Sequence, residues 1–130
     1  MNIKEVAKKY ELSEATIRYY EKVGLIPPVH RNSVGYRDFT QEDENWINFS
    51  KCMRNAGMSV ESLSEYISLF GQGDSTVGRR KEILEEQQAA IKAKLDDMQS
   101  TYDRLSMKIN TYDEHLAKFE KELENQKENV

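Results

Sequence analysis

The sequence predicts a mainly α-helical chain in which a winged helix-turn-helix unit is followed by a long coiled-coil helix. Three observations support this fold class. Two short helical segments are joined by a turn of about three residues, a segment with strand-forming residues follows them, and an apolar heptad repeat fills the last part of the chain. The 130 residues fit about one domain with an extension.

The charge distribution is uneven along the chain. The net charge is −4, but residues 1–40 carry +2 and residues 41–130 carry −6. The positively charged N-terminal part is therefore the part expected to bind a phosphate backbone. The single cysteine excludes an internal disulfide framework and suits a reducing cytosol. No signal peptide and no apolar run of the ~20 residues that span a membrane are visible, so we expect a cytoplasmic protein without a membrane partner.

The second helical segment is the centre of the prediction. The first helix is expected over Ile3–Tyr10, and the second begins after Ser13, an N-cap residue, and ends at Gly24. Ile17 should face the core, while Arg18 lies on the exposed side. Arginine suits contacts with guanine or phosphate in a major groove, although an ordinary amphipathic surface helix would show the same pattern.

The segment Pro27–Phe39 is expected to form a two-stranded ribbon, or wing, with its tip near 31–33. Arginine and tyrosine side chains there can contact the DNA backbone, although a plain connecting loop remains an alternative. The predicted DNA-contacting residues are Ser13, Ala15, Thr16, Arg18, Tyr19, Lys22, Arg31, Tyr36 and Arg37.

Two further helices should close a small core. Thr40 caps a helix over about 41–56, with an expected buried stripe of Trp46, Phe49, Met53 and Ala56. Ser59 caps the next helix, which runs to about Phe70; its expected stripe is Val60, Leu63, Ile67 and Phe70.

The C-terminal part carries an apolar repeat at alternating steps of four and three residues from Leu84 to Leu123, interrupted only by Gln88. Such a repeat is typical of a coiled coil, and a helix of this length extends about 60 Å. A single solvated helix would leave the stripe in water, so a second copy of the chain is the simplest partner. The predicted dimer interface is Leu84, Ile91, Leu95, Met98, Tyr102, Leu105, Ile109, Tyr112, Leu116 and Phe119.

We therefore divide the chain into a DNA-binding domain (1–70), a linker (71–75), a coiled-coil dimerisation helix (76–125) and a disordered tail (126–130). A homodimer would hold two recognition helices at a fixed separation, as paired half-sites on double-stranded DNA require.

The sequence also resembles the MerR family of bacterial transcription regulators over residues 1–70, with the coiled coil in the place of the family's dimerisation helix. The matching motifs are Ile3-Lys-Glu-Val-Ala7, Thr16-Ile-Arg-Tyr-Tyr-Glu21, Gly24-Leu-Ile-Pro27, Gly35-Tyr-Arg37 with Phe39, and Gly57-Met-Ser59.

This resemblance implies a homodimer with antiparallel long helices that binds promoter DNA. It also implies that four side chains contact DNA: Arg18, Tyr19, Tyr36 and Arg37. The resemblance further implies that the protein acts in the bacterial cytoplasm, at the nucleoid. Such regulators distort an overlong promoter spacer, and so act on RNA polymerase indirectly, through DNA deformation.

The sequence predicts neither a metal site nor a cofactor. His30, His115 and Cys52 lack ligand spacing, and the cysteines of metal-sensing relatives are not matched. A lone cysteine such as Cys52 is usually a small buried hydrophobe. However, Lys51 and Arg54 could favour its thiolate, and the chain resembles a short-tailed, single-cysteine subgroup associated with aldehyde and other electrophile stress. Both interpretations stay open.

Other function classes explain less of the sequence. No phosphate loop, acid–base pair or activated nucleophile points to an enzyme. A coiled-coil adaptor would explain the repeat but not the Arg18 helix and the Gly-Tyr-Arg ribbon. A repressor without a thiol switch remains an alternative to an activator.

Overall fold

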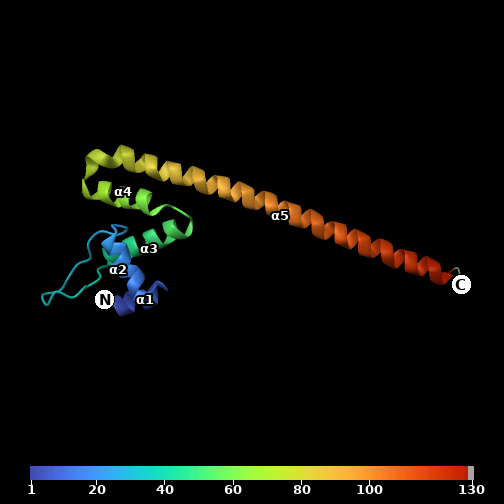
Figure 1. Cartoon of the computed structure of the whole chain (residues 1–130), viewed down its shortest axis with the longest axis horizontal. Helices are drawn as coiled ribbons and strands as arrows, with labels where there is room; N and C mark the ends of the chain where they lie inside the picture. The colour runs from blue at the N-terminus through green and yellow to red at the C-terminus, as the bar shows by residue number, and fades with distance from the viewer. Residues whose placement is uncertain (129–130) are drawn as a thin grey trace. The chain divides into compact units, whose positions relative to one another are not determined.

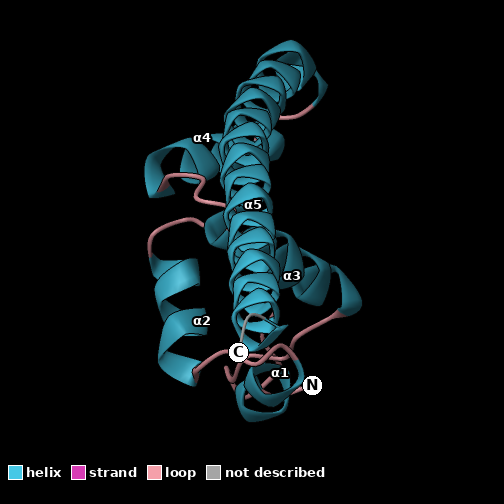
Figure 2. Cartoon of the chain, turned by 90° about the vertical axis from the view of Figure 1, so that its right-hand side faces the viewer, coloured by secondary structure: helices cyan, strands magenta, loops and turns pink. Residues whose placement is uncertain are grey.

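The computed structural model describes residues 1–128 and consists of helices and connecting loops (Figure 2). The elements are α1 (Ile3–Lys9), α2 (Glu14–Lys22), α3 (Gln41–Asn55), α4 (Val60–Gly71), the short 3₁₀ helix η1 (Asp74–Thr76) and α5 (Val77–Glu128). The chain divides into two compact units, Met1–Gln88 and Ala89–Val130. The predicted fold class, a helix-turn-helix unit followed by a long helix, is confirmed.

The three N-caps predicted from the sequence, Ser13, Thr40 and Ser59, are present, and Asn2 caps α1 in the same way. The Asn2, Ser13, Thr40 and Ser59 side chains each accept a hydrogen bond from the backbone N–H three residues later. Such caps satisfy donors that the first helical turn leaves unpaired. The helix starts were therefore predictable from local sequence alone.

Helices α1–α4 of the first unit gather around one core, from which the loop between α2 and α3 extends (Figure 1). Every one of these helices contributes apolar side chains to the core, and so do the loop and the start of α5. The buried members are Val6, Ala7, Ile17, Tyr20, Leu25, Ile26, Val29, Phe39, Ile47, Met58, Leu63, Ile67 and Ile83. Ile17 lies on the inner face of α2, as predicted, and Tyr20 is buried on the same helix.

The buried face of α3 differs from the prediction. Ile47 and Ser50 are fully buried, and Asp43 and Glu44 are 5% exposed, whereas the predicted stripe residues are only partly buried. The polar members are satisfied: the Ser50 hydroxyl donates to the Leu25 carbonyl, and Glu44 accepts from Lys9 and Tyr10. Because hydrogen-bonded polar residues share this face, apolar spacing alone placed it incorrectly.

Helix α4 buries Leu63 and Ile67, but Phe70 is 42% exposed and lies at the edge of the core. The Phe70 ring packs edge-to-face against Trp46, with 4.8 Å between centroids, and the Arg80 guanidinium lies 5.2 Å from its centroid. Its prediction as a core residue was therefore wrong.

The segment that connects α4 to η1 is shorter than the predicted linker (71–75), because α4 includes Gly71 and η1 begins at Asp74. Gly73 has a φ of +93°, which glycine adopts at little cost. The first unit continues to Gln88, beyond the predicted boundary at residue 70, since Ile83 at the start of α5 packs into its core. At the other end, α5 continues to Glu128, so 126–128 are helical where we expected disorder; 129–130 lie outside the described residues.

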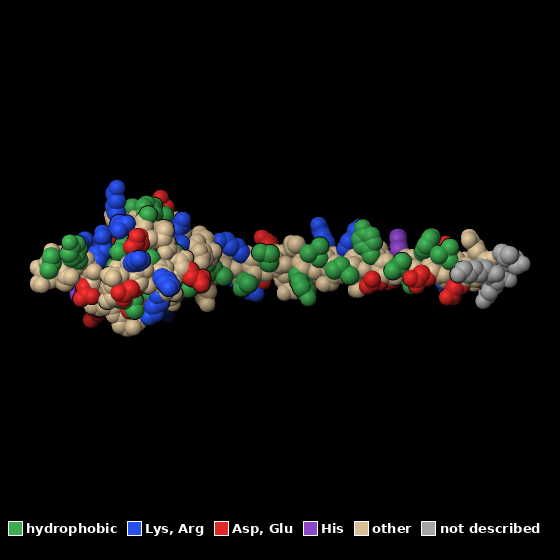
Figure 3. Space-filling view, turned by 90° about the horizontal axis from the view of Figure 1, so that it is seen from below, with side chains coloured by type: hydrophobic (Ala, Val, Ile, Leu, Met, Phe, Trp, Pro, Cys, Tyr) green, Lys and Arg blue, Asp and Glu red, His purple; other side chains and the backbone are tan. Residues whose placement is uncertain are grey.

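The second unit is a stretch of α5 along which hydrophobic side chains face solvent (Figure 3). The exposed fraction is 57–70% for eight of the predicted interface residues: Leu95, Met98, Tyr102, Leu105, Ile109, Tyr112, Leu116 and Phe119. An apolar stripe of this length is unusual on a helix in water and points to a helical partner. Among the described residues, no helix has an apolar stretch long enough to cross a membrane.

Candidate nucleic-acid interface

Helix α2 exposes its polar face to solvent because its apolar face is packed into the core. Ile17 is fully buried and Tyr20 nearly so, and the Ser13 cap fixes the first turn through a 3.0 Å bond from the Thr16 N–H. Consequently Arg18 and Tyr19 face solvent, with Tyr19 47% exposed. Ser13 and Ala15 are also exposed, whereas Thr16 is half-buried and its hydroxyl lies 2.7 Å from that of Ser13.

The wing is a tight loop rather than the two-stranded ribbon that we predicted. It contains an isolated antiparallel bridge between Arg31 and Arg37, and its turn lies at residues 33–35 instead of 31–33. Asn32 explains this position: its side-chain oxygen accepts hydrogen bonds from the N–H groups of Val34 and Tyr36, at 3.0 and 3.1 Å. Gly35, at φ +95°, completes the turn. Tyr36 is consequently held outward, 71% exposed.

A surface cavity of about 660 Å³ lies where α2, the wing and the start of the chain meet. Arg18 from α2 and three predicted wing residues, Arg31, Tyr36 and Arg37, line it together. The remaining lining residues are Met1, Asn2, Ile3, Glu5, Asn32 and Asp38. The structure thus brings three arginines from distant parts of the sequence to one concave surface, a suitable place for a polyanion.

The other predicted DNA-contacting residues lie outside this cavity. Ser13 caps α2, and Ala15, Thr16 and Tyr19 lie along it. Lys22 lines a separate groove that also contains Trp46 and Phe70.

Glu21 connects α2 to the wing, a role that the sequence did not indicate. One of its carboxylate oxygens accepts a 2.9 Å hydrogen bond from Nε of Arg37, and the other accepts a 2.6 Å bond from the Val29 N–H. Arg31 lies 3.7 Å from the same carboxylate. The side chain of Glu21 is only 14% exposed. A glutamate on α2 gives no sequence signal for such a contact, because its partners lie in another segment of the chain.

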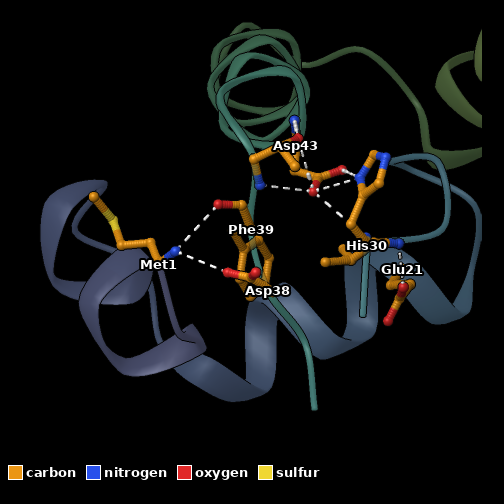
Figure 4. A network of polar contacts seen from close by, with 8 residues as sticks. Met1, Glu21, His30, Asp38, Phe39 and Asp43 are labelled. Carbon is orange, nitrogen blue, oxygen red and sulfur yellow. Dashed lines mark hydrogen bonds and ion pairs between the residues drawn. The ribbon is translucent and has the colours of Figure 1, made fainter. Parts of the chain in front are cut away.

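His30 and Asp43 join the wing to α3 (Figure 4). Nδ1 of His30 lies 2.9 Å from Asp43, which also accepts hydrogen bonds from the N–H and hydroxyl of Thr40. Burial alone would raise the pKa of Asp43, but these hydrogen bonds outweigh it and lower the pKa below its ordinary value. The bond to Asp43 raises the pKa of His30.

The start of the chain is bonded to the far end of the wing (Figure 4). The Met1 ammonium group donates to Asp38 at 3.2 Å and to the Phe39 carbonyl at 3.3 Å, and the Phe39 N–H donates to the Met1 carbonyl at 2.8 Å. Three separate contacts, through Glu21, Asp43 and Met1, therefore position the wing.

Cys52 is exposed on α3, which argues against its interpretation as a buried hydrophobe. The two neighbouring cations are engaged elsewhere: Lys51 donates to the Tyr10 carbonyl at 2.7 Å, and Arg54 donates to the Met58 carbonyl at 2.6 Å. Neither contact is directed at the thiol. Within residues 1–128 no group of three or more His, Cys, Asp or Glu side chains could hold a metal ion.

The fold and this surface define a class: a helix-turn-helix DNA-binding protein with a wing and a long C-terminal helix. Family comparison supports this class, since residues 1–69 match the MerR HTH family regulatory proteins and residues 45–107 match the MerR DNA-binding family. The chain belongs to the MerR family of DNA-binding transcriptional regulators, which are not enzymes.

Individual relatives agree with this assignment. The chain is 56% identical over 91 residues to the HTH-type transcriptional regulator AdhR of Bacillus subtilis, covering 70% of this chain and 65% of AdhR. A MerR family regulator from Listeria monocytogenes superposes with a TM-score of 0.90 at 47% identity, covering 96% and 95% of the two chains. HiNmlR, a MerR family regulator lacking the sensor domain and solved bound to promoter DNA, gives a TM-score of 0.79 at 30% identity over 89% and 92%.

Proposed function

We propose that this chain acts as a homodimer that binds promoter DNA through α2 and the wing of each copy. The observation that carries the proposal is the cavity where Arg18 and the wing arginines meet, in a family that binds promoter DNA. A likeness to a structure bound to promoter DNA supports this use of the surface. Arginine is suited to phosphate and to guanine because its planar group donates paired hydrogen bonds.

Within this surface the residues have different roles. Arg18 and Tyr19 on the exposed face of α2 approach the major groove, with Ala15 close to the bases and the hydroxyls of Ser13 and Thr16 near phosphate. Lys22, Arg31, Tyr36 and Arg37 contact the backbone and set the orientation of the duplex.

The exposed stripe of α5 supports a homodimer. Two copies of the stripe, paired antiparallel, would remove Leu95, Leu105 and Leu116 from water and place two DNA-binding units on one duplex. Such a dimer acts on RNA polymerase indirectly, by distorting an overlong promoter spacer. Repression remains the alternative outcome of the same binding.

Mutation of the two arginines tests the DNA contacts. The probe is a duplex that the wild-type protein selects from a random-sequence pool, and affinity is measured by fluorescence anisotropy across a salt series. Arg18→Ala and Arg37→Ala should each weaken binding about tenfold and reduce the salt slope by about one. Arg104→Ala removes the same charge from an exposed position on α5 outside the predicted interface and should leave affinity unchanged. Unchanged binding by both site variants would refute the assignment.

We further propose that the exposed Cys52 thiol reacts with electrophiles and thereby changes the activity of the dimer. Its thiolate would add to the β-carbon of an α,β-unsaturated aldehyde: the C–S bond forms as the C=C π bond breaks, and the α-carbon takes up a proton from water. The resemblance to the single-cysteine subgroup and the exposure of the thiol support this step.

In vitro transcription separates the thiol switch from spacer distortion. Treatment with an unsaturated aldehyde should increase transcription by the wild-type protein but not by Cys52→Ala, which should still bind the promoter. Shortening the spacer towards the length that polymerase prefers should remove the need for the protein. Full activation of Cys52→Ala would exclude the switch, and a fall in transcription on adding the protein would support repression.

A further inference from the structure

Glu21 stands out because it is an acidic residue whose carboxylate pairs with two arginines of the proposed DNA surface, Arg31 and Arg37. It lies in the last turn of α2, one turn after Arg18, and its carboxylate reaches both ends of the wing. Oε2 accepts a hydrogen bond from the N–H of Val29, near the start of the wing, and Oε1 accepts one from Nε of Arg37, after the wing's turn.

The groups that make these hydrogen bonds are largely shielded from water, which strengthens the bonds. The Glu21 side chain is 14% exposed, that of Arg37 is 24% exposed, and Val29 is a buried core residue. A charged hydrogen bond between poorly exposed groups contributes more than a surface ion pair, and loss of the carboxylate would leave the Val29 N–H without its acceptor. The contact is therefore capable of holding the wing at a fixed distance from α2.

Arg31 and Arg37 can bind DNA while they keep their contacts within the protein. The Arg37 guanidinium uses Nε for Glu21, so its Nη groups stay available for a phosphate. Arg31 donates from Nη1 to the Gly35 carbonyl at 3.1 Å, and its Nη2 lies 3.7 Å from Glu21. The carboxylate thus fixes the direction of Arg37 by a hydrogen bond and lies within ion-pair distance of Arg31.

We propose that Glu21 is a positioning residue, which does not itself contact DNA but sets the register between Arg18 on α2 and Arg31 and Arg37 on the wing. This inference rests on the proposed DNA-binding function. It implies that sequence-specific binding needs Glu21, although a negative charge near the phosphates opposes non-specific binding.

The direction in which DNA affinity changes when Glu21 is replaced distinguishes a positioning role from a simple charge effect. If Glu21 were only a nearby negative charge, its removal would tighten binding to every duplex. If it positions the wing, its removal weakens binding to the preferred sequence and leaves binding to other sequences equal or tighter. The two roles therefore predict opposite changes for the same variant and duplex.

The experiment measures affinity for the selected duplex and for a scrambled duplex of the same length. Glu21→Ala should bind the selected duplex about tenfold more weakly and the scrambled duplex at least as well, which lowers the specificity ratio. Glu21→Gln keeps an acceptor for Val29 but loses the ion pair, so it should show a smaller effect in the same direction. Glu14→Ala and Glu14→Gln are the matched controls, since Glu14 loses the same charge from α2 without contacting the wing.

A double-mutant cycle provides the readout that a merely destabilising change would not produce. Arg37→Ala should weaken binding to the selected duplex less in the Glu21→Ala background than in the wild type, because the arginine is already misplaced. Thermal unfolding identifies any variant that fails to fold, in which case Glu21→Gln decides the question.

Two results would overturn the inference. One is that the folded Glu21 variants bind the selected duplex as tightly as the wild type or more tightly; the other is additivity of Glu21→Ala and Arg37→Ala. A random pool that yields no preferred duplex for the wild type would instead reject the proposed function, and this inference with it.

Discussion

Arg18, Arg37 and Tyr36 illustrate what can be predicted at the scale of single residues. Their type and spacing indicated a DNA surface, and the first unit brings all three to one cavity. Glu21 and Asn32 were not predicted, although the first holds the wing arginines and the second closes the wing turn. Their roles depend on partners that only the folded chain brings within hydrogen-bond distance, and acidic or amide residues are common on any surface.

The His30–Asp43 pair gives a pH dependence at this scale. The folded-state pKa of His30 is raised by Asp43, with smaller contributions from Glu42 and Asp38. A raised folded pKa means that the stabilisation is fully present below the unfolded value of about 6.5 and is lost as pH rises through the folded value. The free energy of unfolding that His30→Asn removes should therefore be larger at about pH 6 than at about pH 9.

Denaturant titration across this pH range measures the difference. Asp43 stays ionised throughout, since its pKa is lowered by its hydrogen bonds from Thr40 and His30 despite its burial. His115→Asn, which removes the other histidine from an exposed position on α5, serves as the control. An effect of His30→Asn that is constant with pH would show that the ion pair does not stabilise the fold.

At the scale of elements, helix starts were predictable and helix faces less so. Caps are local, so Ser13, Thr40 and Ser59 marked the true starts of their helices. The face of α3 was misplaced because Ser50 and Glu44 are buried through hydrogen bonds to other elements. Hydrophobic spacing cannot report a polar residue whose partner lies far away in the sequence.

The capping box of α3 provides a prediction at this scale. The Thr40 hydroxyl accepts from the Asp43 N–H at 3.2 Å, and Asp43 accepts in return from the Thr40 N–H at 2.9 Å. Thr40→Ala should lower the free energy of unfolding by about 0.5–2 kcal/mol, whereas Thr40→Ser keeps the hydroxyl and should lose less. Urea denaturation compares the two variants, and equal stability of Thr40→Ala and the wild type would show that the cap is unimportant.

At the scale of the whole molecule, the order of a helix-turn-helix unit followed by a long helix agrees with the sequence. The heptad repeat predicted one long helix, and α5 extends over 52 residues. The repeat could not show that Ile83 belongs to the core of the first unit, because periodicity does not tell which neighbour covers a residue. Nor does periodicity determine whether two copies of the helix pair parallel or antiparallel.

Two copies on one duplex are the central claim, and sedimentation velocity of the full chain, alone and with the selected duplex, tests it most directly. We expect a dimer at micromolar protein and two chains per duplex. Leu105→Glu should give monomers because it places a charge in the apolar stripe. Met107→Glu, at a residue 71% exposed and outside the stripe, should remain dimeric. A wild-type chain that is monomeric alone and binds the duplex as a single copy would contradict the account.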